Sequence, residues 1–299
     1  MSFADRLVAL VAKRESQIVL GLDPDPSRLW PQALDAAPSG AAPARRAASA
    51  VAAHCVALID AAGPACIAVK PQLACFERLG ADGWAALRTT VEHAREAGLL
   101  VIADAKRGDI DVSAAAYAQA LVGSTQTPFG EVRGLGADAF TANPLLGVDA
   151  LTPFVDAIRD AHAGIFVLVR TSNPGAADVE DLELANGGSV WERLAGIVAG
   201  LAGPGDGLSD IGAVVGATRP EHVSRMRELM PRAPFLLPGI GAQGGRVADL
   251  APAFAAGKAG GLVSASRSIA RAHEGGDRSP ADAARAEAER LREAAWSLG

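Results

Sequence analysis

The chain has 299 residues, of which 49% are hydrophobic and only 4% aromatic, so it can bury a large core whose packing depends heavily on Ala and Gly. Its formal net charge is −6, and no run of Lys and Arg carries interleaved aromatics, so the composition gives no support to nucleic-acid binding. No apolar run approaches the ~20 residues of a membrane span, and Asp5 and Arg6 stand where a signal peptide needs apolar residues. We therefore expect a cytoplasmic protein without a membrane partner.

The cysteines and histidines give no metal-binding pattern. Cys55, Cys66 and Cys75 form no CxxC pair and have no His at ligand spacing, so we expect buried, reduced thiols and no metal site. Five histidines fall one per segment in predicted helices or loops, where packing or surface roles are expected: His54, His93, His162, His222 and His273.

The chain begins with a predicted helix, because Phe3, Leu7 and Val11 recur at helical spacing. Eight short apolar stretches then follow, which we interpret as strands buried on both faces. The segments that carry them are residues 17–25, 66–72, 99–112, 139–144, 164–173, 211–218, 234–245 and 261–269.

Helical patterns separate these strands. Their predicted ranges include 45–62, 76–97, 148–161, 190–201 and 219–230, and an Ala-rich helix ends near 117–122. A last helix has Ser279 as N-cap and Pro280 at its first position. Residues 28–44 and 174–188 are predicted loops, and the Gly- and Thr-rich residues 123–136 an excursion before the next strand.

Eight strands that alternate with helices predict a closed (β/α)8 TIM barrel, a single α/β domain over residues 1–299 with an N-terminal helix. An open doubly wound sheet is the alternative, but it normally carries a G-x-G-x-x-G turn after its first strand. Residues 21–24 offer no such turn, and the glycines of residues 241–245 lack the spacing.

In such a barrel the carboxyl ends of the strands share one mouth, and charged residues follow several strands. In residues 99–112 the strand alternation turns Asp104 and Lys106 to one side and Arg107 to the other. Asp104 and Lys106 make an array of alternating charge with Lys70 and Asp109, which would hold Lys106 protonated as a proton donor rather than a Schiff-base nucleophile. The alternative is a structural ion pair at a strand end.

The last two strand ends indicate a phosphate site. Gly239 and Gly241 free the backbone for close approach, Gln243 supplies an amide and Arg267 a guanidinium that can bind two oxygens. The alternative is a tight glycine turn beside a surface ion pair of Arg267.

These residues match a known family. Residues 104–110, Asp-Ala-Lys-Arg-Gly-Asp-Ile, resemble the D-x-K-R-x-D-I signature of the orotidine 5′-phosphate decarboxylases, in their longer bacterial subgroup. Five further matches occur in the expected order, at residues 22–23, 69–71, 171–175, 238–244 and 266–269. The resemblance therefore covers nearly the whole chain.

The resemblance implies decarboxylation of orotidine 5′-monophosphate to UMP and CO2 in de novo pyrimidine biosynthesis, with no cofactor. Its implied catalytic residues are Lys70, Asp104, Lys106 and Asp109, with Lys106 as proton donor to C6 and Asp109 reaching the neighbouring subunit's site in a homodimer with shared active sites.

The resemblance also implies a set of substrate contacts. These are Asp23 for the ribose, Ser172 for the pyrimidine, Gln243 and Arg267 for the phosphate, and Ser113 at a position where relatives carry a Thr that crosses the dimer interface.

Two other functions compete with this one. Metal-dependent sugar-phosphate decarboxylases and aldolases of the same superfamily share a D-x-K-x-x-D segment, but they place an acidic residue at the strand-two end, where this chain has Lys70. A phosphate-binding barrel without catalysis would keep the phosphate residues and lose the charged array, and both sets are present here.

Overall fold

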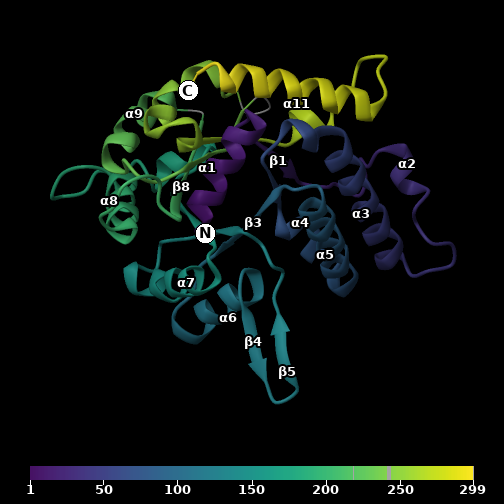
Figure 1. The fold of residues 1–299 in the computed structure, drawn as a ribbon, viewed down its shortest axis with the longest axis horizontal. Coiled ribbons are helices and arrows are strands. Elements are labelled where there is room, and N and C mark those ends of the chain that lie inside the picture. The colour runs from purple at the N-terminus through teal and green to yellow at the C-terminus, as the bar shows by residue number, and fades with distance from the viewer. Residues whose placement is uncertain (218, 241–243, 299) are drawn as a thin grey trace.

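The computed structural model describes residues 1–217, 219–240 and 244–298, and its central feature is a closed barrel of eight parallel strands (Figure 1). Around the barrel the strand order is β1-β10-β9-β8-β7-β6-β3-β2. The predicted (β/α)8 barrel is confirmed, and each of the eight predicted segments contains one of its strands. They are β1 Ile18–Leu22, β2 Ala68–Pro71, β3 Leu100–Arg107, β6 Ala139–Ala142, β7 Gly164–Arg170, β8 Ile211–Val215, β9 Phe235–Leu237 and β10 Gly261–Ala265.

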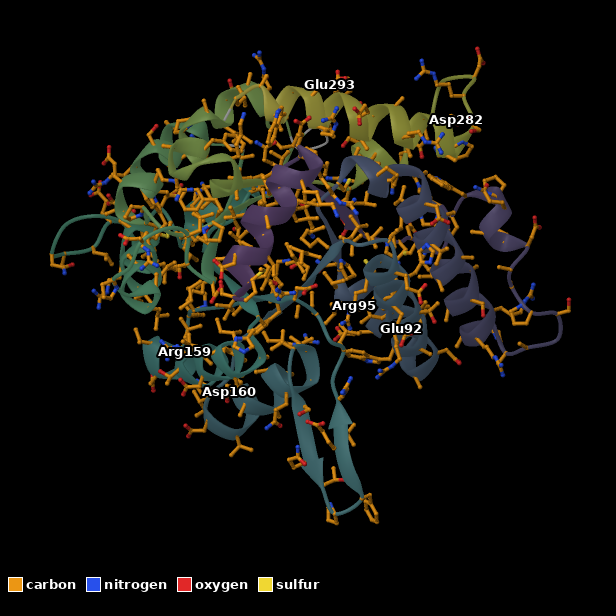
Figure 2. All side chains as sticks on the ribbon, viewed as in Figure 1. Glu92, Arg95, Arg159, Asp160, Asp282 and Glu293 are labelled. Carbon is orange, nitrogen blue, oxygen red and sulfur yellow. The ribbon has the colours of Figure 1, made fainter. Side chains whose placement is uncertain are left out.

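Helices surround the barrel, and the first of them covers one of its ends. They are α1 Phe3–Arg14, α2 Pro31–Leu34, α3 Pro43–Ala62, α4 Leu73–Glu77, α5 Gly80–Glu96, α6 Asp111–Leu121, α7 Val148–Ala161, α8 Val190–Ala202, α9 Pro220–Leu229, α10 Arg267–Ala270 and α11 Pro280–Trp296. The 3-10 turns are η1 Gly63–Ala65, η2 Pro174–Asp178, η3 Val247–Ala256 and η4 Lys258–Gly260. Figure 2 shows the labelled charged side chains of α5, α7 and α11 on the outer side of these helices.

The N-terminal helix α1 lies across the barrel (Figure 1) and packs into its interior. Ser2 and Asp5 form a capping box at its start. Phe3 packs edge-on against Phe166 of β7, with ring centroids 6.0 Å apart. Gly164 makes this contact possible, because a Cβ there would come within 2.3 Å of the Phe3 ring. One end of the barrel is thereby filled, so the other end is left for a site.

Several segments differ from the sequence prediction. The predicted loop 28–44 contains α2 and the start of α3. Residues 123–136 contain a hairpin of β4 Ser124–Thr127 and β5 Gly130–Arg133, which projects from the body (Figure 1). Its strands are polar and largely exposed, so they carry no apolar alternation from which a strand could be predicted. The predicted helix 76–97 is instead two helices, α4 and α5, separated before Gly80, whose φ of +66° is left-handed.

Residues Pro43–Ala65 are, contrary to the sequence expectation, long and apolar enough to cross a membrane. More than half of this stretch is buried within the protein, where α3 packs against α5 and α11. Alanine raises its mean hydropathy and also allows this close packing. A buried core helix passes the same test of length and composition, so the finding carries no further conclusion.

Candidate active site

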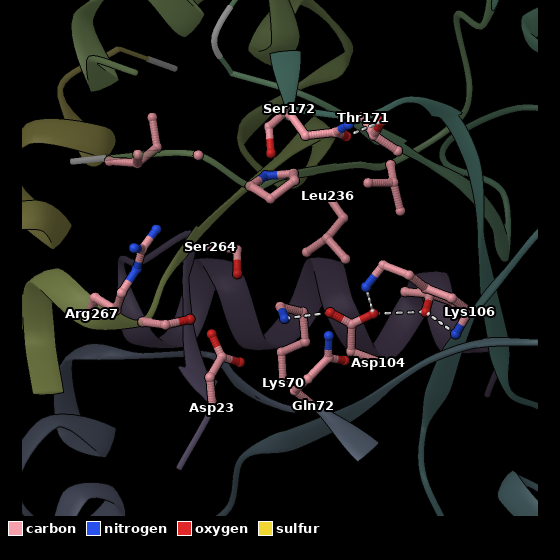
Figure 3. A pocket seen from close by; sticks show the side chains of 17 residues that line it. Asp23, Lys70, Gln72, Asp104, Lys106, Thr171, Ser172, Leu236, Ser264 and Arg267 are labelled. Carbon is pink, nitrogen blue, oxygen red and sulfur yellow. Dashed lines mark hydrogen bonds and ion pairs between the residues drawn. The ribbon is translucent and has the colours of Figure 1, made fainter. Parts of the chain in front are cut away.

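A cavity of about 440 Å³ opens at the carboxyl ends of the strands (Figure 3). This volume is in the range of small-molecule sites. Residues near or just after the carboxyl ends of β1, β2, β3, β7 and β10 line it together, as the barrel predicts. The predicted site residues brought together here are Asp23, Lys70, Asp104, Lys106, Ser172 and Arg267.

Asp104 lies between two ammonium groups. Lys70 Nζ donates to Asp104 Oδ2 at 2.6 Å, and Lys106 Nζ donates to Asp104 Oδ1 at 2.5 Å. Lys70 and Asp104 are 6% and 7% exposed, whereas the Lys106 side chain is 43% exposed toward the cavity. Charge-assisted hydrogen bonds of this length fix the three side chains relative to one another.

The pKa values of the buried pair follow from this geometry. Burial is the largest single effect on Asp104 and favours its neutral form, but Lys70 and Lys106 together outweigh it and hold the pKa of Asp104 well below its usual range. Burial likewise favours neutral Lys70, but Asp104 and Asp23 more than offset it and raise the pKa of Lys70. At neutral pH the site therefore holds an aspartate anion and a lysine cation.

Arg267 lies at the opposite end of the cavity from Lys106 (Figure 3). It begins α10, directly after β10, and it is exposed. Within the described parts of the chain its guanidinium has no carboxylate partner, so the alternative of a surface ion pair has no support. Gly239 borders the same region with a φ of +103°. Gln243, the other predicted phosphate residue, lies outside the described residues.

The loop after β7 holds Ser172 at the cavity. The buried Arg170 donates two hydrogen bonds to Asp181, from Nη2 to Oδ2 at 2.9 Å and from Nε to Oδ1 at 3.2 Å. The Thr171 amide donates to Glu180 at 2.8 Å. Gly216 permits the close approach of β8, because a Cβ there would lie 2.9 Å from Ser172 Cα. The start of the loop is thus fixed from three directions.

Asp109 and Ser113 are not brought into the cavity. Asp109 Oδ1 accepts from the amide of Ile110 at 2.8 Å, and Ser113 is exposed on α6. Their roles remain predictions that concern a second subunit. Arg107 points away from the cavity, as expected: it pairs with Glu77 and lies over the Tyr117 ring, 5.2 Å from its centroid.

Gln72, Thr141 and Ser264 also line the cavity, and none of them belongs to a sequence motif that predicted the site. Gln72 follows Lys70 and Pro71 at the β2 end, so its place in the chain was a usable signal. Ser264 lies inside β10 and Thr141 inside β6, where a single hydroxyl in an apolar strand gives no such signal. Thr141 Oγ1 nevertheless donates to Asp104 Oδ1 at 2.9 Å and accepts from the Lys106 amide at 2.9 Å.

Metal-ligating side chains do not cluster in the described residues: no group of three or more His, Cys, Asp and Glu could hold a metal ion. The histidines pack elsewhere, with His54 and His273 edge-on to Trp30 and His222 stacked on Trp191. All three cysteines are free thiols; Cys55 and Cys66 are buried as predicted, but Cys75 is only half-buried.

The fold agrees with the comparison to known proteins. A sequence profile of the orotidine 5′-phosphate decarboxylase / HUMPS family matches residues 16–284. The chain belongs to this family. The relatives of this chain in the family are orotidine 5′-phosphate decarboxylases, which are carboxy-lyases. Solved structures of such enzymes have the same barrel fold as this chain.

Individual family members resemble the chain over most of its length. Orotidine 5′-phosphate decarboxylase of Rhodopirellula baltica is 40% identical over 283 residues, which cover 92% of this chain and 90% of that protein. The enzyme of the same name from Deinococcus radiodurans is 42% identical over 278 residues, which cover 90% and 89%. The solved structure of Leishmania donovani OMP decarboxylase superimposes with a TM-score of 0.74 at 32% identity, covering 98% of this chain and 99% of that one.

Proposed function

We propose that this protein decarboxylates orotidine 5′-monophosphate to UMP, as a cytoplasmic enzyme of de novo pyrimidine biosynthesis that needs no metal or organic cofactor. The observation that carries the proposal is Asp104 held between Lys70 and Lys106 in a cavity whose far end presents Arg267. The names of the relatives support the same substrate.

In the proposed reaction the bond between C6 and the carboxylate carbon breaks, and its electron pair stays on C6 as CO2 departs. The Lys106 ammonium stabilises that developing negative charge and gives its proton to C6, which yields UMP. Neutral Lys106 then regains a proton from solvent. Its 43% exposed side chain supports this step, since solvent reaches Lys106 once the product has left the cavity.

The other members of the array keep the donor in place. Asp104 would lie against the departing carboxylate while it holds the Lys106 ammonium by a hydrogen bond, and Lys70 balances its charge. Asp23 and Lys70 would bind ribose hydroxyls, Ser172 the pyrimidine amide edge, and Arg267 with Gln243 the phosphate. Phosphate binding far from C6 would supply energy to orient the reacting ring.

We infer a homodimer in which Asp109 and Ser113 complete the partner's site. Both follow β3, directly beside the cavity residues of that strand, yet neither lines the cavity of its own chain. Ile110 and Val112 next to them are 53% and 83% exposed, which supports burial of this segment against a second copy.

The metal-dependent relatives are the closest competing function. Lys70 argues against them, because a buried ammonium 2.6 Å from Asp104 would repel a divalent cation bound to that carboxylate. An assay of purified protein separates the two: the ultraviolet absorbance of orotidine 5′-monophosphate should change at the same rate with and without EDTA. No change, or a change that EDTA abolishes, would contradict the proposed function.

A further inference from the structure

We propose that Thr141 is a positioning residue, which fixes the backbone of Lys106 and the carboxylate of Asp104 in one register so that the Lys106 ammonium is aimed into the cavity. The effect of Thr141 on turnover rests on the proposed function. Its effect on the position of Lys106 does not.

The first observation is an irregularity in the sheet beside the site. Strands β3 and β6 pair Ala103 with Phe140 and then Arg107 with Ala142. Three residues of β3 therefore lie opposite one residue of β6, Thr141. Such a bulge re-aims side chains and interrupts the backbone hydrogen bonds of the ladder.

The second observation is the backbone of Lys106. Its φ of +48° is left-handed, a conformation that is unfavourable for a residue with a Cβ and persists only where the surroundings enforce it. The Lys106 amide is satisfied by the Thr141 hydroxyl at 2.9 Å. The threonine side chain thus replaces the ladder bond that the bulge removes.

The third observation is the direction of the two hydrogen bonds. A hydroxyl has one proton, and ionised Asp104 can only accept, so Thr141 must donate to Asp104 Oδ1 and accept from the Lys106 amide. The same Oδ1 receives the Lys106 ammonium at 2.5 Å. Thr141 therefore links the Lys106 backbone amide to the same carboxylate that binds the Lys106 ammonium. Because Thr141 is 1% exposed, water does not compete for these bonds.

The test compares two variants. Thr141→Val keeps the shape but loses the donor and the acceptor, and it should lower kcat by roughly 30-fold or more while KM stays within about threefold. Thr141→Ser keeps the hydroxyl and should stay within about threefold of the wild type in both constants. Unchanged kcat in Thr141→Val, or a Ser variant as impaired as the Val variant, would overturn the proposal. If Thr141→Val does not fold, Thr141→Ala takes its place.

A second readout is independent of activity. The chain has four lysines, Lys13, Lys70, Lys106 and Lys258, so ¹³Cε-lysine NMR gives few resonances, and Lys106→Arg assigns one of them. The Lys106 resonance should move in Thr141→Val and return in Thr141→Ser, with Lys13 and Lys258 as internal controls. If the wild type does not consume orotidine 5′-monophosphate, the proposed function is wrong, but the spectrum still tests the positioning role. A Lys106 resonance that does not move in Thr141→Val would overturn that role.

Discussion

Asp104 determines the charge state of the whole site at the scale of single residues. One buried carboxylate accepts hydrogen bonds from two ammoniums, so the buried Lys70 is not an uncompensated cation. The strand-end positions of Lys70, Asp104 and Lys106 were visible in the sequence because charges are rare in apolar strands. The role of Thr141 was not, since it depends on a bulge and a left-handed backbone that no spacing reveals.

Arg267 provides a test of the distant end of the cavity. Arg267→Ala should weaken the binding of UMP by roughly 10- to 100-fold, because a guanidinium hydrogen-bonded to a phosphate contributes about 1.5–3 kcal/mol. The binding of uridine, which has no phosphate, should hardly change. Calorimetric titration measures both affinities. If Arg267→Ala weakened the binding of UMP and uridine equally, Arg267 would not be a phosphate ligand.

At the scale of elements, the barrel strands are short buried apolar runs, and several of them end in polar residues; this contrast made the strands predictable. The hairpin β4–β5 lacks it, because both of its strands are mostly exposed. The break between α4 and α5 was also missed, because the helical pattern continues across Gly80. Neither segment lines the cavity, so these errors left the predicted site intact.

The contact between α3 and the segment before α2 has a pH dependence. His54 Nδ1 accepts from the Trp30 amide at 3.1 Å, and burial, with His273 nearby, lowers the pKa of His54 to about 4. In the unfolded chain His54 titrates near pH 6.5. Its contribution to stability is therefore complete above about pH 6.5 and is lost as the pH falls toward 4.

Denaturant unfolding at pH 7.5 and pH 4.5 measures this contribution. His54→Gln should reduce the loss of unfolding free energy between the two pH values by roughly 2–3 kcal/mol relative to the wild type. His162→Asn, at the exposed left-handed end of α7, is the control and should leave the loss unchanged. An identical pH dependence in wild type and His54→Gln would contradict the assignment.

At the scale of the whole molecule, the barrel gathers residues from distant parts of the chain at one mouth, which is why the list of strand ends predicted the cavity. It does not gather Asp109 and Ser113. Whether these two serve a neighbouring site depends on a second chain, and a single sequence carries no direct record of that geometry. The exposed apolar residues beside them are consistent with such a neighbour.

Subunit mixing tests the shared site. Lys106→Ala and Asp109→Ala should each be inactive alone. In a heterodimer one site lacks both groups and the other lacks neither, so random mixing of equal amounts should restore about a quarter of the wild-type activity. Mass spectrometry confirms the exchange of subunits. Confirmed heterodimers without recovered activity would assign Asp109 to its own chain.

The most direct test of the central claim, that Lys106 is the proton donor, is the turnover of Lys106→Ala with orotidine 5′-monophosphate. General acid groups contribute about 10²- to 10⁴-fold, and Lys106 also stabilises the developing carbanion, so kcat should fall by roughly 10⁴-fold or more. The affinity for UMP should change by less than about tenfold, because Arg267 and Asp23 remain. A variant that keeps kcat within about tenfold of the wild type would contradict the account.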